Sequence, residues 1–166
     1  DHPVLFSVPS GNLGNLTAGL MTKRMGLPVK MFIAGTNANN IFANIVAKGT
    51  STGSLSNKHT LANSMDISVP SNLERILFLY GESPKNIPDI LSNKKSITPA
   101  VAESLRKDVF GEDIITNEDI EAHIVRFWRR NNIVIEPHGA IGVAASFRYR
   151  QYFSGDKSII AVLETA

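Results

Sequence analysis

The chain has 166 residues, 43% of them hydrophobic and 19% charged, a balance typical of a folded globular protein and not of a disordered or fibrous one. Seventeen Lys and Arg against fifteen Asp and Glu leave a net charge of +2, which is too small to indicate nucleic-acid binding. The absence of cysteine excludes disulfides, thiolate metal sites and a cysteine nucleophile. Since the apolar runs are too short to span a membrane, we expect a soluble, cytoplasmic protein with neither a nucleic-acid nor a membrane partner.

The N-terminal part of the chain alternates strand and helix patterns. Buried strands are predicted over 4–8 and 29–34, and helices over 13–25 and 38–48. Such alternation favours parallel strands joined by crossover helices. We therefore predict the α/β class, with a three-layer open parallel sheet that carries helices on both faces, in a single domain covering 1–166.

The remainder begins with a polar stretch, 50–69, which predicts a long loop of the kind that is often functional. Ser71 and Glu74 have capping-box spacing and predict the start of a helix that runs to about Tyr80. The elements predicted after it are helices over 98–109, 117–130 (capped by Thr116) and 139–152, a short strand or approach segment over 133–135, and a last strand over 158–163.

The loop between the first strand and the first helix, Ser10-Gly11-Asn12-Leu13-Gly14-Asn15, is the first candidate site. Backbone N–H groups at a helix start can bind a phosphate, with the helix dipole behind them. The spacing is neither that of a P-loop nor that of a dinucleotide fingerprint, because no Gly-Lys-Ser/Thr run and no acidic residue after the second strand are present. A plain turn, in which Ser10 or Asn12 caps the helix, is the alternative.

Four segments, taken in order, resemble the threonine synthases, which are pyridoxal-phosphate enzymes of the tryptophan-synthase-β-like fold. These segments are PSGNLGNLTAG (9–19) with KRMGLPVK (23–30), GTNANNIF (35–42), SMDISVPSNLER (64–75), and EPHGAIGVAA (136–145) with LETA (163–166). The resemblance implies that the chain forms part of one lobe of that fold. Leu13 and Gly139 depart from the family pattern, which more often has an aromatic residue and a threonine there.

The resemblance also implies roles for individual residues. The cofactor phosphate would be bound by the loop residues Gly11, Asn12, Leu13, Gly14 and Asn15, and the pyridine nitrogen of pyridoxal phosphate by Thr165. An amino-acid phosphate ester, the expected small-molecule substrate, would be bound by Ser64, Ser71, Asn72 and Arg75. The alternatives are that Ser71 and Glu74 only cap a helix, that Arg75 is solvated, and that Thr165 is an ordinary terminal residue.

The parent reaction implied by the resemblance converts O-phosphohomoserine and water to threonine and phosphate. In this family the Schiff-base lysine precedes the phosphate loop and follows a phenylalanine, whereas no lysine of this chain does. We therefore expect a fragment that has no turnover alone. No sequence spacing indicates a metal site. The alternatives are an amino-acid dehydratase or β-replacement enzyme of the same fold, or a non-catalytic phosphate- or nucleotide-binding domain.

Overall fold

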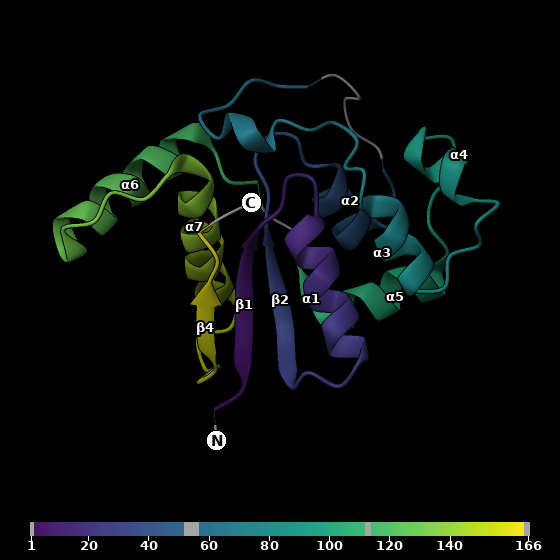
Figure 1. Ribbon diagram of the computed structural model, residues 1–166, viewed down its shortest axis with the longest axis horizontal. Coiled ribbons are helices and arrows are strands. Elements are labelled where there is room, and N and C mark those ends of the chain that lie inside the picture. The colour runs from purple at the N-terminus through teal and green to yellow at the C-terminus, as the bar shows by residue number, and fades with distance from the viewer. Residues whose placement is uncertain (1, 52–56, 112–113, 165–166) are drawn as a thin grey trace.

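Parallel strands form the centre of the computed structural model of this chain, which describes residues 2–51, 57–111 and 114–164. The four strands lie in the order β3-β2-β1-β4, and all neighbouring pairs are parallel. Their bounds are β1 Val4–Pro9, β2 Val29–Gly35, β3 Val109–Phe110 and β4 Ile159–Val162. All carboxyl ends therefore meet at one edge of the sheet, which is the upper edge in Figure 1.

The helices divide between the two faces of the sheet because the chain reverses its direction across the strand order. The helices are α1 Gly14–Arg24, α2 Ile41–Lys48, α3 Leu73–Leu79, α4 Ile87–Leu91, α5 Pro99–Asp108, α6 Asn117–Asn131 and α7 Pro137–Tyr152, with a 3₁₀ turn, η1, at Asn63–Met65. The connections from β1 to β2 and on to β3 run one way, whereas β3 to β4 runs back. Right-handed crossovers then place α1 to α5 on one face and α6 and α7 on the other (Figure 1).

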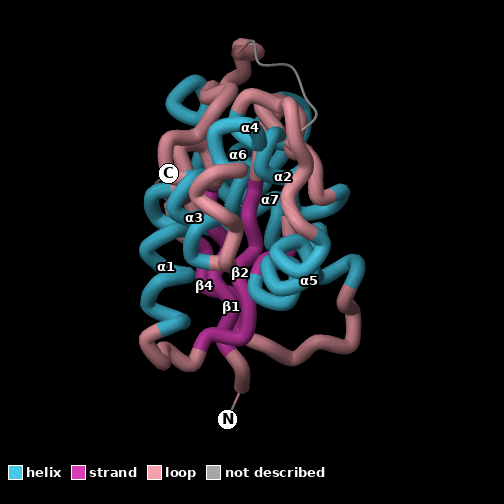
Figure 2. The backbone as a smooth tube through the Cα atoms, turned by 90° about the vertical axis from the view of Figure 1, so that its right-hand side faces the viewer, coloured by secondary structure: helices cyan, strands magenta, loops and turns pink. Residues whose placement is uncertain are grey.

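Side chains of alternate strand residues build a core on each face. Phe32 and Ala34 belong to a large cluster with residues of α1, α2, α3 and α5, whereas Leu5 and Ile33 pack with Ala145 and Tyr149 of α7. Figure 2 views the molecule from the side on which α1 to α5 lie in Figure 1. This division confirms the predicted α/β fold with helices on both faces of a parallel sheet.

Helix α7 lies very close to the strands that it covers. The Ser7 hydroxyl of β1 donates a 2.6 Å hydrogen bond to the Gly142 carbonyl oxygen. A Cβ atom at Gly142 would lie 3.1 Å from Val162 Cγ1 and 3.2 Å from the Leu163 carbonyl oxygen. Glycine at this position therefore allows α7 to pack tightly against β1 and β4.

Of the two alternatives for 133–135, the short strand is wrong and the approach segment is confirmed. Residues 133–136 form an irregular link that follows Asn132, whose left-handed φ of 56° ends α6. The apolar side chains of Ile133 and Val134 suggested a buried strand, but both are exposed. The strand that completes the sheet is β3, which follows α5 at once and pairs with Phe32 and Ile33.

Helix starts were predicted with mixed success. The Thr116 cap is confirmed, since its hydroxyl accepts a hydrogen bond from the Asp119 backbone N–H at 3.2 Å. The capping box at Ser71 and Glu74 is wrong, because α3 begins after Asn72 and has no side-chain cap. The predicted loop over 50–69 contains η1, and its residues 52–56 lie outside the described part of the chain. The short helix α4 was not predicted.

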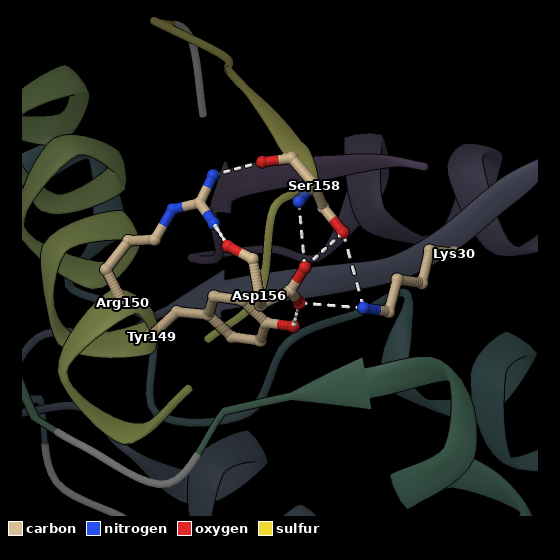
Figure 3. Close-up of polar contacts among 5 residues, drawn as sticks. All are labelled: Lys30, Tyr149, Arg150, Asp156 and Ser158. Atoms are coloured by element: carbon tan, nitrogen blue, oxygen red, sulfur yellow. Dashed lines mark hydrogen bonds and ion pairs between the residues drawn. The ribbon is translucent and has the colours of Figure 1, made fainter. Parts of the chain in front are cut away.

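A polar cluster ties α7 and β4 to β2 at the amino end of the sheet (Figure 3). The Asp156 carboxylate accepts hydrogen bonds from Lys30 Nζ at 2.7 Å, from the Tyr149 hydroxyl at 2.5 Å and from the Ser158 backbone N–H at 2.8 Å. Arg150 donates to the carbonyl oxygens of Asp156 and Ser158. We call Lys30, Tyr149, Arg150, Asp156 and Ser158 the Asp156 latch.

The latch shifts the titration of its members. The bond from Lys30, followed by those from Ser158 and Tyr149, holds the pKa of the Asp156 carboxyl far below its usual range. Burial and then the bond to Asp156 raise the pKa of Tyr149 to about 12. A depressed carboxyl pKa stabilises the fold above the unfolded pKa of about 3.9, and this stabilisation is lost as the pH falls below it.

We predict that Asp156→Asn lowers the free energy of unfolding at pH 7 by about 2 kcal/mol, because bonds to a charged acceptor are lost. The same change should flatten the stability loss between about pH 4 and pH 2. Urea unfolding followed by circular dichroism across this range measures both effects. Exposed Glu103→Gln is the control, and an unchanged pH profile in Asp156→Asn would contradict the role of the latch.

Candidate functional site

The β1–α1 loop lies at the carboxyl edge of the sheet, and its ends are fixed by backbone bonds. The Ser10 N–H donates to the Gly35 carbonyl oxygen at 2.8 Å. The Leu13 carbonyl oxygen accepts from the backbone N–H of Thr17 at 2.9 Å and from its hydroxyl at 2.7 Å. Between these anchors Leu13 adopts φ 62° and ψ 14°, the left-handed region, which costs a residue with a side chain about 1–2 kcal/mol.

This geometry leaves donors available at the start of α1. Within the described residues, the N–H groups of Gly11, Asn12, Leu13 and Gly14 donate no hydrogen bond. The alternative of a plain capped turn is wrong, since Ser10 donates to the Val8 carbonyl oxygen and no side chain caps α1. Consecutive N–H donors at a helix N-terminus are the arrangement that binds a phosphate group. The loop thus fits the phosphate of a cofactor.

The glycines of this loop serve two different purposes. A Cβ atom at Gly11 would lie 2.9 Å from Met65 Cα, so Gly11 is required because η1 packs directly against it. At Gly14 the nearest atom to such a Cβ would be Asn72 Nδ2, at 3.7 Å, which leaves room for a side chain. Close packing between two chain segments therefore selects glycine at position 11, and not access for a ligand.

A polar network holds η1 in this position. Asn37, which is buried after β2, donates from Nδ2 to Thr60 Oγ1 and to Asp66 Oδ1, each at 2.9 Å. Asp66 also accepts from the Thr60 backbone N–H at 2.9 Å and from Asn39 Nδ2 at 3.0 Å. Because Asp66 follows η1 directly, the network fixes Met65 over Gly11. The sequence predictions missed these residues, although GTNANN and SMDI contain three of them.

One hydroxyl at this edge is unpaired. Thr36, between Gly35 and Asn37, is fully buried, and its Oγ1 has no hydrogen-bond partner within the described residues. A buried hydroxyl without a partner is costly and is found at functional sites. Sequence alone gave no signal for it, because a threonine after a strand has many ordinary explanations.

Two of the predicted substrate residues, Ser71 and Asn72, contact the β1–α1 loop, and a third, Arg75, contacts Asn72. The Asn12 side-chain oxygen accepts from the Ser71 backbone N–H at 2.7 Å and from its hydroxyl at 2.9 Å. Asn72 Nδ2 donates to the Asn12 carbonyl oxygen at 2.8 Å, and Arg75 donates to Asn72 Oδ1. Ser64 is exposed on η1, beside Met65. Thr165 lies outside the described residues.

No group of three or more His, Asp or Glu side chains in the described part of the chain could hold a metal ion. No helix there is long and apolar enough to cross a membrane.

Comparison with known proteins places this edge of the sheet in context. No protein-family model matches the chain. It is 34% identical to threonine synthase of Schizosaccharomyces pombe over 171 residues and 38% identical to threonine synthase-like 2 of Xenopus laevis over 164 residues, covering 87% and 94% of this chain. The chain is homologous to threonine synthases. It spans about a third of the length of these relatives, since each match covers 33% of the relative.

Solved structures of threonine synthases show the same fold. A PLP-bound threonine synthase from Brucella melitensis aligns with a TM-score of 0.83 and 28% identity, covering 100% of this chain and 36% of that one. The yeast threonine synthase gives a TM-score of 0.82 at 28% identity, covering 98% of this chain and 36% of that one. Threonine deaminase isoform 2 from Solanum lycopersicum, at 16% identity and a TM-score of 0.57 over 99% of this chain and 40% of that one, shares the fold.

We predict that Gly11→Ala lowers the free energy of unfolding by about 1–3 kcal/mol, because the added methyl would collide with the Met65 backbone. Gly14→Ala is the matched control, in the same loop and with free space, and should change stability by less than about 1 kcal/mol. Urea unfolding of both variants tests this pair. Equal losses of stability would show that η1 does not constrain the loop.

Proposed function

We propose that a full-length protein containing this chain is a threonine synthase, which converts O-phosphohomoserine and water to threonine and phosphate with pyridoxal phosphate. The observation that carries the proposal is the run of available N–H donors at the start of α1 in a chain homologous to threonine synthases. Pyridoxal phosphate supplies an electron sink for the carbanions of such a reaction. Within the parent, residues 1–166 would be one α/β domain of the cofactor lobe.

The loop from Gly11 to Asn15 would bind the phosphate group of the cofactor. Its N–H donors lie at the positive end of the α1 dipole, where a dianion is favoured, and no lysine is needed. Within the described residues no acidic side chain lies in the first turn of α1, so nothing there repels a phosphate. The loop would therefore fix one end of the cofactor.

The other contacts are proposed from sequence position. Thr165 would place a neutral hydroxyl beside the pyridine nitrogen, which, unlike a carboxylate, does not hold that nitrogen protonated. Arg75 is exposed on α3 and supplies a guanidinium group suited to the phosphate of the substrate, and Ser64 is exposed on η1. The lysine that binds the cofactor covalently would lie in a part of the parent outside this chain. A cytoplasmic location stays a prediction.

The proposal is tested by supplying the purified full-length protein with pyridoxal phosphate and each of three substrates. We expect threonine and inorganic phosphate from O-phosphohomoserine, detected by chromatography and a phosphate assay, and no keto acid from serine or threonine. Keto-acid formation without threonine would make the protein a dehydratase. The 166-residue chain alone should form no threonine, and threonine formation by it would contradict the assignment of the lysine to another segment.

We also predict that Gly14→Asp raises the dissociation constant for pyridoxal phosphate at least tenfold in the full-length protein, because a carboxylate would sit among the donors meant for the phosphate. The same carboxylate should raise the free energy of unfolding of the cofactor-free protein by about 0.3–1 kcal/mol, since it lies at a helix N-terminus. Absorbance titration and urea unfolding measure the two effects. Gly14→Ala should change neither much, and unaltered cofactor affinity in Gly14→Asp would place the phosphate elsewhere.

A further inference from the structure

Asn12 connects the phosphate loop to the start of α3, which lies about 60 residues further along the chain. Its side-chain oxygen accepts two hydrogen bonds from Ser71, and its carbonyl oxygen accepts one from Asn72. Arg75 holds the other end of the Asn72 amide by donating to Oδ1. We call these bonds from Ser71 and Asn72 to Asn12 the Asn12 clamp.

The clamp determines where the loop donors point. In a planar trans peptide the carbonyl oxygen and the N–H group point in opposite directions. Because Asn72 binds the Asn12 carbonyl oxygen, the N–H of Leu13 is turned away from α3. Thr17 binds the Leu13 carbonyl oxygen in the same way, so the N–H of Gly14 is turned away from the body of α1. Two consecutive donors are thus oriented by two bonded carbonyl groups.

The clamp also opposes relaxation of the loop. Leu13 is left-handed at φ 62°, and its side chain is only 2% exposed in the core below α1. Burial holds the side chain, but it does not by itself determine the orientation of the preceding peptide. The bond from Asn72 supplies that constraint, because rotation of the Asn12–Leu13 peptide would break it.

We propose that Ser71 and Asn72 are positioning residues for the cofactor-phosphate loop, and that they orient its donors before the cofactor arrives. This inference rests on the proposed function, since it assigns the loop to a phosphate. Binding is strengthened when donors are already ordered in the free protein, because less conformational freedom is lost on association. The clamp would therefore act on cofactor affinity and not on the substrate.

The hydrogen bonds of Ser71 and Asn72 distinguish positioning of the loop from helix capping and from substrate binding. A helix-capping side chain would accept from the first N–H groups of α3, whereas no side chain caps that helix. A substrate ligand would keep donors available, whereas the Ser71 hydroxyl and the Asn72 amide both donate to Asn12. Arg75 differs from Ser71 and Asn72, because a single guanidinium nitrogen donates to Asn72 and, within the described residues, the others stay available to a substrate.

The test uses the full-length protein and the variant Asn72→Ala, which removes the bond to the Asn12 carbonyl oxygen. Glu74→Ala is the matched control, because Glu74 lies in the same turn of α3, is exposed and has no hydrogen-bond partner within the described residues. The measurements are the dissociation constant for pyridoxal phosphate, hydrogen exchange of the Ser71 and Thr17 amides without cofactor, and KM and kcat for O-phosphohomoserine at saturating cofactor. These two amides donate to the Asn12 side chain and to the Leu13 carbonyl oxygen, so their exchange reports loosening of the loop.

We expect Asn72→Ala to raise the dissociation constant for pyridoxal phosphate about tenfold and to speed exchange of the Ser71 and Thr17 amides, with KM unchanged. Ser71→Ala and Asn12→Ala should each weaken cofactor binding, and their double variant should lose no more than the larger single loss. Glu74→Ala should leave the cofactor dissociation constant and the exchange rates unchanged.

Other outcomes separate the possible errors. A raised KM with unchanged cofactor affinity in Asn72→Ala would overturn the inference and make Asn72 a substrate ligand. Lower stability alone, with affinity and amide exchange unchanged, would also overturn it and leave a purely structural role. A wild-type full-length protein that binds no pyridoxal phosphate would overturn the proposed function, whereas the exchange rates would still decide whether the clamp orders the loop.

Discussion

The carboxyl edge of this sheet depends on Leu13, a residue held in a conformation that its own side chain disfavours. Its carbonyl oxygen is bound twice by Thr17, and its side chain is buried beneath α1. A left-handed residue at this point turns the chain abruptly from strand into helix. Within the described residues, the N–H groups of Gly11, Asn12 and Gly14 then have no backbone acceptor. Strain of this kind persists only where the surrounding structure determines the backbone completely.

Two distant segments provide that surrounding structure. On one side Met65 packs against Gly11 and is fixed by the network of Asp66 with Asn37 and Thr60. On the other side the start of α3 binds Asn12. Both segments come from the long connection between β2 and β3, which in a shorter protein of this topology would be a single crossover helix. The additional residues of this connection therefore pack on both sides of the β1–α1 loop.

The sequence predicted the elements that have clear local signals. Strands β1 and β2 and helices α1 and α7 were predicted with end errors of one or two residues, because apolar runs and the Gly and Pro residues beside them are local signals. Strand β3 has two residues and no such signal, and of the two alternatives for 133–135 only the approach segment was correct. The loop between β1 and α1 was also predicted, since glycines between strand and helix are a local signal.

The conformation of that loop could not be predicted in the same way. Ser71 and Glu74 have the spacing of a capping box, and a local rule has no means of knowing that Asn12 lies within reach of Ser71. Likewise Gly11 looks like a residue required by a ligand, whereas Met65 requires it. In both cases the role of the residue depends on a partner far away in the sequence, and a local sequence pattern does not identify such a partner.

The Asp156 latch lies at the opposite end of the strands from the phosphate loop, at a distance of about 20 Å for a strand of this length. Substitutions more than about 10 Å apart with no shared partner usually have additive effects. Substitutions in the Asp156 latch should therefore change stability without changing the geometry of the β1–α1 loop. Stabilising substitutions at the amino end of the sheet could therefore offset the stability that is lost through substitutions in the β1–α1 loop.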